Sequence, residues 1–481
     1  MTVTKSQKQS KVGDNMIALR ADEFARIMGG TLHGLDPAII ITERPVFDSR
    51  KAAADTFFLA LKGEKRDGHE FIAEALANGA RFAIVSQKTH YPSILVEDVM
   101  EALVLLATEV RQRLAKMTVI GITGSQGKTT TKDLLFQILS TQGETISPEG
   151  SFNNELGLPL TLLSATEMTQ FCILEMGARH MGDIAKLTHI ARPNVGVVLV
   201  VGTAHIGEFG SRERIAQTKG ELIRELPEGA CAVLGTYDEF TPHMADGLSL
   251  KVSLFGEGHD CQVRAADIEF RDGRAHFDLV TPQGRQAVAL QLFGSHQIAN
   301  ALAAASVADY LGVPLETIAA TLSTATNRSK WRMEITNMSD LTVINDSYNA
   351  NPESMRAAIK TLVHLSQERG GVSWAFLGKM QELGASERSA HQEIGRLAHD
   401  LGIDHLVDVG GAGYLMIPGD VMQSQTQEHA CANIESALDL VDHFQPGDVI
   451  LIKASRSEGL ELLAEKIKER WSHLRDGQEK I

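Results

Sequence analysis

The stretch TGSQGKTT, residues 123–130, lies between an apolar run, TVIGIT (Thr118–Thr123), and a helical pattern over residues 130–140. Glycines let a backbone wrap closely around phosphate groups, so that N–H groups at the start of the following helix point at the anion. A lysine adds a mobile cation, and a threonine hydroxyl can bind Mg²⁺. Ile122 stands where the usual G-x-x-x-x-G-K-[ST] pattern has its first glycine. We nevertheless expect a strand–loop–helix phosphate site made by Gly124, Ser125, Gln126, Gly127, Lys128, Thr129 and Thr130.

Two further apolar runs follow, FCILEMG (residues 171–177) and NVGVVLVVGTAH (residues 194–205), with helical patterns between them. Strands that are apolar throughout and alternate with helices are typical of a parallel sheet covered on both faces. Ligands of such sheets bind at the carboxyl ends of the strands. Because Glu175 and His205 end the two runs, we expect both side chains to lie beside Lys128 and Thr129. A carboxylate at this edge suits Mg²⁺, which prefers oxygen ligands.

The length of 481 residues suggests about three domains. The predicted fold class is α/β: a small N-terminal α/β domain, a central P-loop parallel-sheet ATPase domain and a C-terminal Rossmann-like α/β domain. The runs LTVINDSY, VSWAFLGKM, HLVDVGG and DVILIKA supply four strands for the last of these. We expect a disordered tail over residues 1–16 and domains over residues 17–98, 99–329 and 330–475.

The composition excludes several classes of protein. With 46 Lys plus Arg against 61 Asp plus Glu, the net charge is −15, which argues against a broad nucleic-acid surface. The four cysteines form no C-x-x-C pair, so neither a disulfide framework nor a cysteine-ligated zinc site is expected. The polar N-terminus lacks a secretory pattern, and no apolar run is long enough to span a bilayer. We therefore predict a cytoplasmic protein without a membrane span.

Several motifs together resemble the Mur ligase family. In the central region these are TGSQGKTT, LEMGAR with Glu175, TAHIGEFGS with His205, TKGEL with Lys219 and HQIANALAA with Asn300. RMEI, which contains Arg332, and NDSYNANPESM, which contains Asp346 and Asn349, resemble the start of the family's C-terminal domain. The motifs run from about residue 45 to about residue 462, so the resemblance covers nearly the whole folded chain.

Within the family, four stretches resemble the branch that adds D-alanyl-D-alanine: FDSR, FLALKGEKRDGHEF, SFNNELGLPLTLL and LIKASRSEGLE. Asn349 favours the same branch, because sister ligases typically have aspartate and histidine in that motif. The resemblance implies that ATP phosphorylates the terminal carboxylate of a UDP-N-acetylmuramoyl-tripeptide and that the dipeptide amine attacks the acyl phosphate. The product is the pentapeptide precursor of peptidoglycan, made in the last cytoplasmic step of its synthesis.

The resemblance also implies roles for individual residues. Lys128, Glu175, His205 and Lys219 would be catalytic, and two Mg²⁺ ions would be held by Thr129, Glu175, His205 and Lys219, the last as a carbamate. Asn300 would contact adenine, Arg332 the γ-phosphate and Asp346 the ribose. The substrate residues would be Asp48, Ser49, Arg50, Asn153, Asn154, Arg179, Asn349, Lys453, Ser455 and Arg456. Because the ATP residues come from two domains, we expect domain closure to assemble the site and exclude water.

Two alternatives stay open at this stage. The chain could be another amide ligase of the same superfamily, a sister Mur ligase or a folylpolyglutamate synthetase, which use other amine acceptors. It could also be a P-loop ATPase without ligase activity, whose ATP turnover would not respond to any amine. We expect a monomer that binds the UDP-linked tripeptide and the dipeptide, with no nucleic-acid partner.

Overall fold

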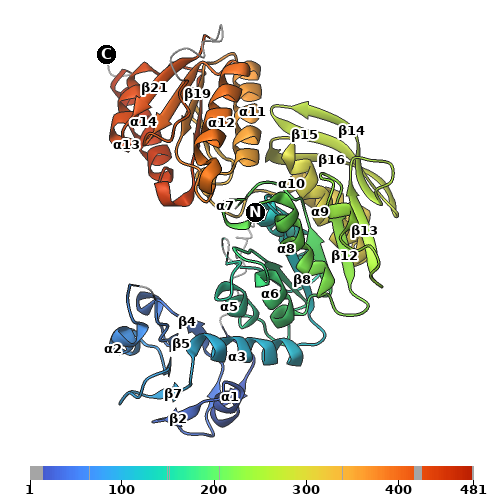
Figure 1. Ribbon diagram of the computed structural model, residues 1–481, viewed down its shortest axis with the longest axis vertical. Helices are drawn as coiled ribbons and strands as arrows, with labels where there is room; N and C mark the ends of the chain where they lie inside the picture. The colour runs from blue at the N-terminus through green and yellow to red at the C-terminus, as the bar shows by residue number, and fades with distance from the viewer. Residues whose placement is uncertain are drawn as a thin grey trace, which may run out of the picture.

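The computed structural model contains three α/β domains arranged along the chain, as predicted for the fold class (Figure 1). Each domain has its own sheet, and the central domain lies between the other two. The structure describes residues 15–63, 65–148, 150, 152–204, 206–338, 340–416 and 425–478.

The N-terminal domain is built on a five-stranded sheet with the order β2-β7-β6-β5-β4, in which only β2 and β7 are antiparallel. Its core contains Phe24, Phe57 and Phe82, whose ring centroids lie 5.2–6.1 Å apart. Met16, which the sequence assigned to a disordered tail, is buried, and residues 1–14 lie outside the described chain. The elements are β1 (Leu19–Arg20), α1 (Ala21–Ile27), β2 (Thr31–His33), β3 (Ile40–Ile41), β4 (Arg44–Val46), η1 (Ser49–Lys51), β5 (Thr56–Leu59), η2 (Gly68–Phe71), α2 (Ile72–Ala77), β6 (Ala83–Val85) and β7 (Ser93–Leu95).

Helix α3 (Val99–Arg113) joins the N-terminal domain to the central domain and runs beneath α5 and α6 (Figure 1). The Asp98 side chain caps it by accepting from the backbone N–H of Glu101. The buried Arg111 guanidinium donates to the carbonyl oxygens of Ala191 at 2.9 Å and Leu114 at 3.0 Å. A buried cation needs such acceptors, so this arginine fixes α3 to the central domain.

The central domain has a nine-stranded sheet with the order β16-β15-β14-β13-β12-β11-β8-β10-β9. The strands from β9 to β14 are parallel, while β14, β15 and β16 form an antiparallel extension that the sequence analysis did not predict. The elements are β8 (Thr118–Thr123), α4 (Lys128–Leu139), β9 (Thr145–Ile146), α5 (Gly157–Leu162), β10 (Phe171–Glu175), α6 (Asp183–Ala191), β11 (Val195–Val198), α7 (Ile206–Phe209), α8 (Arg212–Arg224), β12 (Cys231–Gly235), η3 (Thr241–His243), β13 (Lys251–Gly256), β14 (Val263–Arg271), β15 (Arg274–Thr281), β16 (Gly284–Phe293), α9 (His296–Tyr310) and α10 (Leu315–Thr324).

The predicted strand over residues 194–205 is wrong in its length, because β11 ends at Val198. Strand β8 beside it ends at Thr123, where the phosphate loop leaves the sheet. Beyond Val198 the ladder becomes irregular: the Leu199 N–H still donates to the carbonyl oxygen of Thr123 at 3.0 Å, but the Val201 N–H donates to the Asp238 carboxylate at 2.8 Å. The predicted site residue His205 lies outside the described residues.

The C-terminal domain has a six-stranded sheet with the order β17-β18-β22-β19-β20-β21, in which only β17 is antiparallel. The four predicted strands are confirmed as β18, β19, β20 and β22, whereas β17 and β21 were not predicted. The elements are β17 (Glu334–Asn337), β18 (Thr342–Asn345), α11 (Pro352–Arg369), β19 (Ser373–Leu377), η4 (Gly384–Ser386), α12 (Glu387–Asp400), β20 (His405–Val409), β21 (Gln427–Cys431), α13 (Ile434–Leu438), η5 (Asp439–His443), β22 (Val449–Lys453), η6 (Arg456–Glu458) and α14 (Glu461–Gln478).

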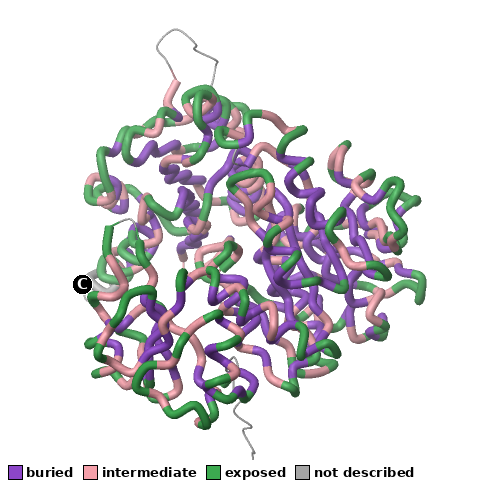
Figure 2. The backbone as a smooth tube through the Cα atoms, turned by 60° about the horizontal axis from the view of Figure 1, so that its bottom comes forward, coloured by how far each residue is buried: buried purple, intermediate pink, exposed green. Residues whose placement is uncertain are grey.

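Buried residues follow the strands and the inner faces of the helices in each domain (Figure 2). The four cysteines, Cys172, Cys231, Cys261 and Cys431, are all free and buried, and burial raises the pKa of each thiol. Among the described residues, no helix is long and apolar enough to cross a membrane.

Candidate functional site

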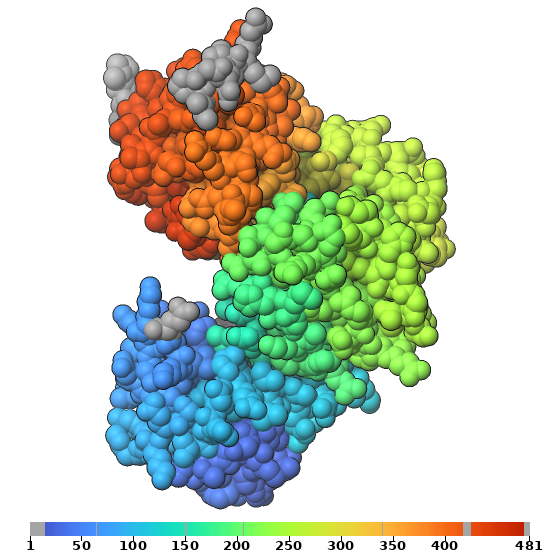
Figure 3. All heavy atoms as spheres, viewed as in Figure 1, coloured from blue at the N-terminus to red at the C-terminus, as the bar shows by residue number. Residues whose placement is uncertain are grey.

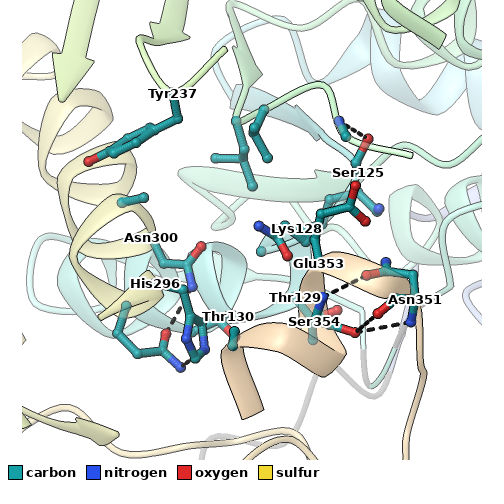
Figure 4. A pocket seen from close by; sticks show the side chains of 18 of the residues that line it. Ser125, Lys128, Thr129, Thr130, Tyr237, His296, Asn300, Asn351, Glu353 and Ser354 are labelled. Carbon is teal, nitrogen blue, oxygen red and sulfur yellow. Dashed lines mark hydrogen bonds between the residues drawn. The ribbon is translucent and has the colours of Figure 1, made fainter. Parts of the chain in front are cut away.

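A cavity of about 920 Å³ lies where the central and C-terminal domains meet. It opens at the carboxyl ends of β8, β10 and β11, the edge at which parallel sheets bind ligands. Figure 4 shows phosphate-loop side chains facing the start of α11, with Tyr237, Asn300 and His296 on the other side. Its lining includes these predicted site residues: Ser125, Gln126, Gly127, Lys128, Thr129, Thr130, Asn153, Glu175, Asn300, Arg332, Asp346, Asn349 and Lys453.

The phosphate loop has the conformation that its sequence predicts. Gly127 lies at the N-cap of α4 with φ of 84°, a left-handed conformation that favours glycine. A Cβ atom at this position would collide with the side-chain oxygen of Asn300. The Lys128 ammonium donates to the carbonyl oxygen of Gly124 at 2.6 Å, and burial lowers its pKa to about 8. Incoming phosphates would take the place of this carbonyl as the partner of the cation.

Glu175 ends β10 and is completely buried next to the phosphate loop. The Thr129 hydroxyl donates to Oε2 of Glu175 at 3.2 Å, while Oε1 accepts no hydrogen bond from the described residues. Burial raises the pKa of this carboxyl, and the nearby cations Lys132, Arg332 and Lys128 oppose the shift. A hydroxyl and a buried carboxylate oxygen with spare acceptor capacity fit Mg²⁺, which typically uses one or two protein oxygens together with phosphates and water.

Lys132, one turn beyond Lys128 on α4, was not singled out from the sequence. Its ammonium is buried and donates to the carbonyl oxygen of Pro148 at 2.8 Å. The same nitrogen lies 3.1 Å from Oδ1 of Asp133 and 3.8 Å from Oε1 of Glu175. A buried cation with these neighbours fixes the position of the Glu175 carboxylate. Only the three-dimensional contacts distinguish this lysine from an ordinary surface lysine of an amphipathic helix.

Asn300 and its neighbours on α9 form the side of the cavity that faces Tyr237 (Figure 4). The Asn300 amide donates to Gln297 Oε1 at 2.8 Å and accepts from the Thr131 hydroxyl at 3.4 Å. The His296 ring is half-buried; its Nδ1 atom is inaccessible to solvent and has no hydrogen-bond partner among the described residues, and desolvation lowers the pKa of the ring. This side of the cavity therefore offers polar side chains and an aromatic ring to a ligand.

The C-terminal domain contributes a second charged group to the cavity. Nζ of Lys453, which is buried, donates to Oδ2 of Asp346 at 2.6 Å and to the carbonyl oxygen of Asn349 at 2.8 Å. The backbone N–H of Met333 donates to the other oxygen of Asp346 at 3.0 Å. The Arg332 guanidinium lies 4.1 Å above the ring of Tyr348. Lys453 thus supports the loop after β18, a role that the sequence did not indicate.

Residues at the start of α11 reach across the cavity to the central domain. The side chain of Asn351 caps the helix in a reciprocal arrangement with Ser354. Oε1 of Glu353 accepts from both the backbone N–H and the hydroxyl of Thr203, each at 2.7 Å. Glu353 was not predicted, since an acidic residue in a first helical turn is common for helix stability alone.

The residues predicted to bind the sugar nucleotide lie apart from this cavity, in the N-terminal domain. The Asp48 carboxylate accepts from the Arg50 guanidinium at 2.8 and 2.9 Å, which lowers the pKa of Asp48 to about 2. Arg50 is largely exposed, whereas the hydroxyl of Ser49 is turned inward and donates to Glu74 at 2.9 Å. A hollow separates this domain from the C-terminal domain (Figure 3).

The remaining predicted substrate residues occupy different environments. Asn153 packs against Gly177 at the cavity, while the Asn154 side chain accepts from the N–H of Gly157, the first residue of α5, at 2.9 Å. The Ser455 hydroxyl accepts from the backbone N–H of Gln381 at 2.9 Å. Two arginines lie outside the cavity: Arg179 is exposed 3.8 Å from Glu382, and Arg456 lies 4.3 Å above the Trp331 ring.

Lys219 lies on α8 and does not line the cavity. Its side chain is buried, and burial together with the charge of Lys128 holds its pKa well below the ordinary range. Among the described residues there is no cluster of three His, Cys, Asp or Glu side chains that could hold a metal alone. A metal ion held by Thr129 and Glu175 would therefore need its further ligands from bound phosphates, water or a modified side chain.

Three family profiles match the chain. They are the Mur ligase family catalytic domain over residues 46–118, the Mur ligase middle domain over 122–308 and the Mur ligase glutamate ligase domain over 331–456. UDP-N-acetylmuramoyl-tripeptide–D-alanyl-D-alanine ligase of Mycobacterium tuberculosis is 39% identical, with 94% of this chain and 98% of that protein covered.

Solved structures resemble the whole fold. MurF from Acinetobacter baumannii superimposes with a TM-score of 0.84 at 34% identity, covering 94% of this chain and 99% of that chain. MurF from Thermotoga maritima, solved in complex with ADP, gives a TM-score of 0.75 at 30% identity and covers 89% of this chain and 99% of that chain. The similarity therefore includes all three domains.

Proposed function

The chain belongs to the Mur ligase family, and from that premise we propose that it joins D-alanyl-D-alanine to a UDP-N-acetylmuramoyl-tripeptide in an ATP-dependent reaction. The observation that carries the proposal is the match along nearly the entire length to relatives named for this activity. The cavity supports it, because it joins a phosphate loop to side chains from the C-terminal domain.

The reaction has two steps. The terminal carboxylate of the tripeptide attacks the γ-phosphorus of ATP, and ADP leaves. The dipeptide amine then attacks the acyl carbon, the bond to phosphate breaks, and the amine loses a proton. In the first step a negatively charged carboxylate approaches a negatively charged phosphate. Catalysis therefore depends on positioning the two groups and neutralising their charge. Lys128 and Arg332 are the cations of the cavity that fit this role.

Magnesium would be held by Thr129 and Glu175, and it would neutralise the nucleotide phosphates when bound. We propose a second ion near His205 and Lys219, with Lys219 carbamylated so that a buried cation becomes an oxygen ligand. Lys219→Ala should abolish activity, and added short-chain carboxylates should restore part of it. Full activity in this variant would remove Lys219 from the mechanism.

For the substrates, we propose that Asn300 contacts adenine and that Asp346 contacts the ribose. Asp48, Ser49 and Arg50 would bind the uridine end, with the exposed Arg50 as the charged contact. Asn153, Asn154 and Arg179 would contact the muramoyl peptide, and Asn349, Lys453, Ser455 and Arg456 would lie near the dipeptide. The hollow beside the N-terminal domain would receive the UDP end of the substrate (Figure 3).

We also propose that the enzyme acts in the cytoplasm as a monomer, with domains over residues 17–98, 99–329 and 330–475. No membrane-spanning helix occurs among the described residues, which is compatible with this location. A sedimentation measurement would test the oligomeric state.

The decisive experiment measures phosphate release with ATP and the UDP-linked tripeptide, with and without D-alanyl-D-alanine. Tripeptides with diaminopimelate or lysine at the third position are compared, and glutamate serves as an alternative acceptor. Turnover that needs both the tripeptide and the dipeptide supports the proposal. Turnover with glutamate would favour a sister ligase, and turnover indifferent to any amine would favour a P-loop ATPase.

A further inference from the structure

Glu353 makes a polar connection between the C-terminal domain and the central domain. It is the second residue of α11, and its Oε1 accepts from the N–H and the hydroxyl of Thr203, each at 2.7 Å (Figure 4). Hydrogen bonds to a charged carboxylate are about twice as strong as those between neutral groups. Two donors on one oxygen also fix the direction of the side chain.

The connection continues from Thr203 to the phosphate loop. The backbone N–H of the adjacent Gly202 donates to the hydroxyl of Ser125 at 2.8 Å. Gly202 also lets the carboxylate approach closely, because a Cβ atom there would lie 3.0 Å from Oε1 of Glu353. Glu353, Thr203, Gly202 and Ser125 therefore form a continuous path from α11 to the loop that holds the phosphates.

Stability alone does not explain this carboxylate. Oε2 of Glu353 is inaccessible to solvent and accepts no hydrogen bond from the described part of the chain. A buried polar atom without a protein partner costs free energy, so this oxygen weakens the contribution of the carboxylate to folding. The contact between Glu353 and Thr203 is thus better explained by the position in which it holds the two domains than by a contribution to folding stability.

Neighbouring contacts show that the C-terminal domain packs against the same segment. Gly207 on α7 lies against Gly384 on η4 so closely that a Cβ atom on Gly207 would come within 2.6 Å of the Gly384 nitrogen. The exposed pair Arg179 and Glu382, 3.8 Å apart, adds little, as exposed ion pairs do. Glu353 is therefore well placed to fix Gly202 and Thr203 against the phosphate loop.

We propose that Glu353 is a positioning residue that ties the C-terminal domain to the phosphate loop and so protects the acyl phosphate from water. The proposal rests on the proposed ligase function. If water attacks the acyl carbon, the bond to phosphate breaks and the tripeptide carboxylate is regenerated, so that one ATP is hydrolysed and no amide forms. A closed site prevents this side reaction until the dipeptide amine attacks.

The test is the ratio of phosphate released to amide formed, measured with ATP, the UDP-linked tripeptide and D-alanyl-D-alanine. We expect a ratio near one for the native enzyme. Glu353→Ala should lower the rate of amide formation by roughly tenfold to a hundredfold, the effect of losing about 1.4–2.8 kcal/mol. It should also raise the ratio, because phosphate continues to be released to water. A purely structural role would lower both rates equally and leave the ratio unchanged.

Glu353→Gln is the matched variant. It removes the same negative charge from the first turn of α11, yet its amide oxygen can still accept from Thr203. We therefore expect Glu353→Gln to keep a ratio near that of the native enzyme. Uncoupling as strong as that of Glu353→Ala would overturn the proposal, because charge rather than hydrogen bonding to Thr203 would then be required.

Thr203→Val supplies an independent check, since it removes the hydroxyl and keeps the N–H. We expect moderate uncoupling, and no further loss when it is combined with Glu353→Ala. Additive losses would mean that the two side chains act separately, against the proposal. Glu368→Ala, at the exposed end of α11, should leave the ratio unchanged. Failure of the native enzyme to require both substrates would instead count against the ligase function itself.

Discussion

Replacing Lys132 with methionine removes a buried positive charge while keeping the length and flexibility of the side chain. In the native chain the ammonium donates to the carbonyl oxygen of Pro148 at 2.8 Å and lies 3.8 Å from Glu175. Both charged side chains are almost fully buried, at 2% and 0% exposure. The variant would leave the buried Asp133 carboxylate, 3.1 Å from Nζ, the Glu175 carboxylate and a carbonyl oxygen without this cation.

Breaking a buried ion pair by removing one partner typically costs about 3–5 kcal/mol. A domain of this size loses roughly 2–4 °C in Tm per kcal/mol, so the variant should melt about 6–20 °C lower. The loss should shrink as the pH falls. Burial raises the pKa of Glu175, and the folded state favours the protonated carboxyl, which needs no cation.

Calorimetry across a pH series measures both effects. Lys186→Met, an exposed lysine on α6, is the matched control and should leave Tm within about 1–2 °C, since a surface substitution typically changes stability by less than 0.5 kcal/mol. A decrease of less than about 2 °C for Lys132→Met would refute the reasoning, because the buried pair would then contribute little. A loss that grows as the pH falls would refute the assignment of Glu175 as the partner.

Three further changes probe the rest of the site. Gly127→Ala places a Cβ atom against Asn300, at a position where the backbone has a left-handed conformation. The affinity for ATP, measured by calorimetric titration, should therefore fall at least tenfold, and an unchanged affinity would contradict the loop geometry. Arg50→Gln removes the guanidinium that lowers the pKa of Asp48 to about 2. In an NMR titration of this variant, the pKa of Asp48 should return towards its ordinary value. A pKa still near 2 would assign the shift to other groups. Lys453→Met removes the buried cation that binds the Asp346 carboxylate at the cavity. KM for ATP should therefore rise more than KM for the UDP-linked substrate. Equal changes in the two KM values would point to general unfolding.

The features that sequence predicted best are those with a local pattern. All the groups that the phosphate loop needs lie within eight consecutive residues. The position of Glu175 followed from the rule that parallel strands bring their carboxyl ends to one edge of the sheet. The same rule assumed too long a strand before His205, a residue that lies outside the described chain. The end of β11 depends on where its neighbour β8 leaves the sheet, and an apolar run cannot show that.

Contacts between charged residues far apart in the sequence were not predicted. Lys132 meets Glu175 across 43 positions, and Lys453 meets Asp346 across 107 positions. In each case the local pattern is an ordinary helix or strand, and only the assembled fold brings the charges together. The antiparallel strands β14 to β16 were also missed, although β15 alternates between buried and half-buried residues as a half-covered strand should.

The burial of all four cysteines has a practical consequence for measuring motion. A thiol reacts with maleimides as its thiolate, and the raised pKa values and burial of these cysteines suppress that form. The native chain should therefore give little background labelling. Two cysteines introduced on exposed faces of the N-terminal and C-terminal domains could then carry a donor and an acceptor dye, and energy transfer between them would follow the domains during turnover.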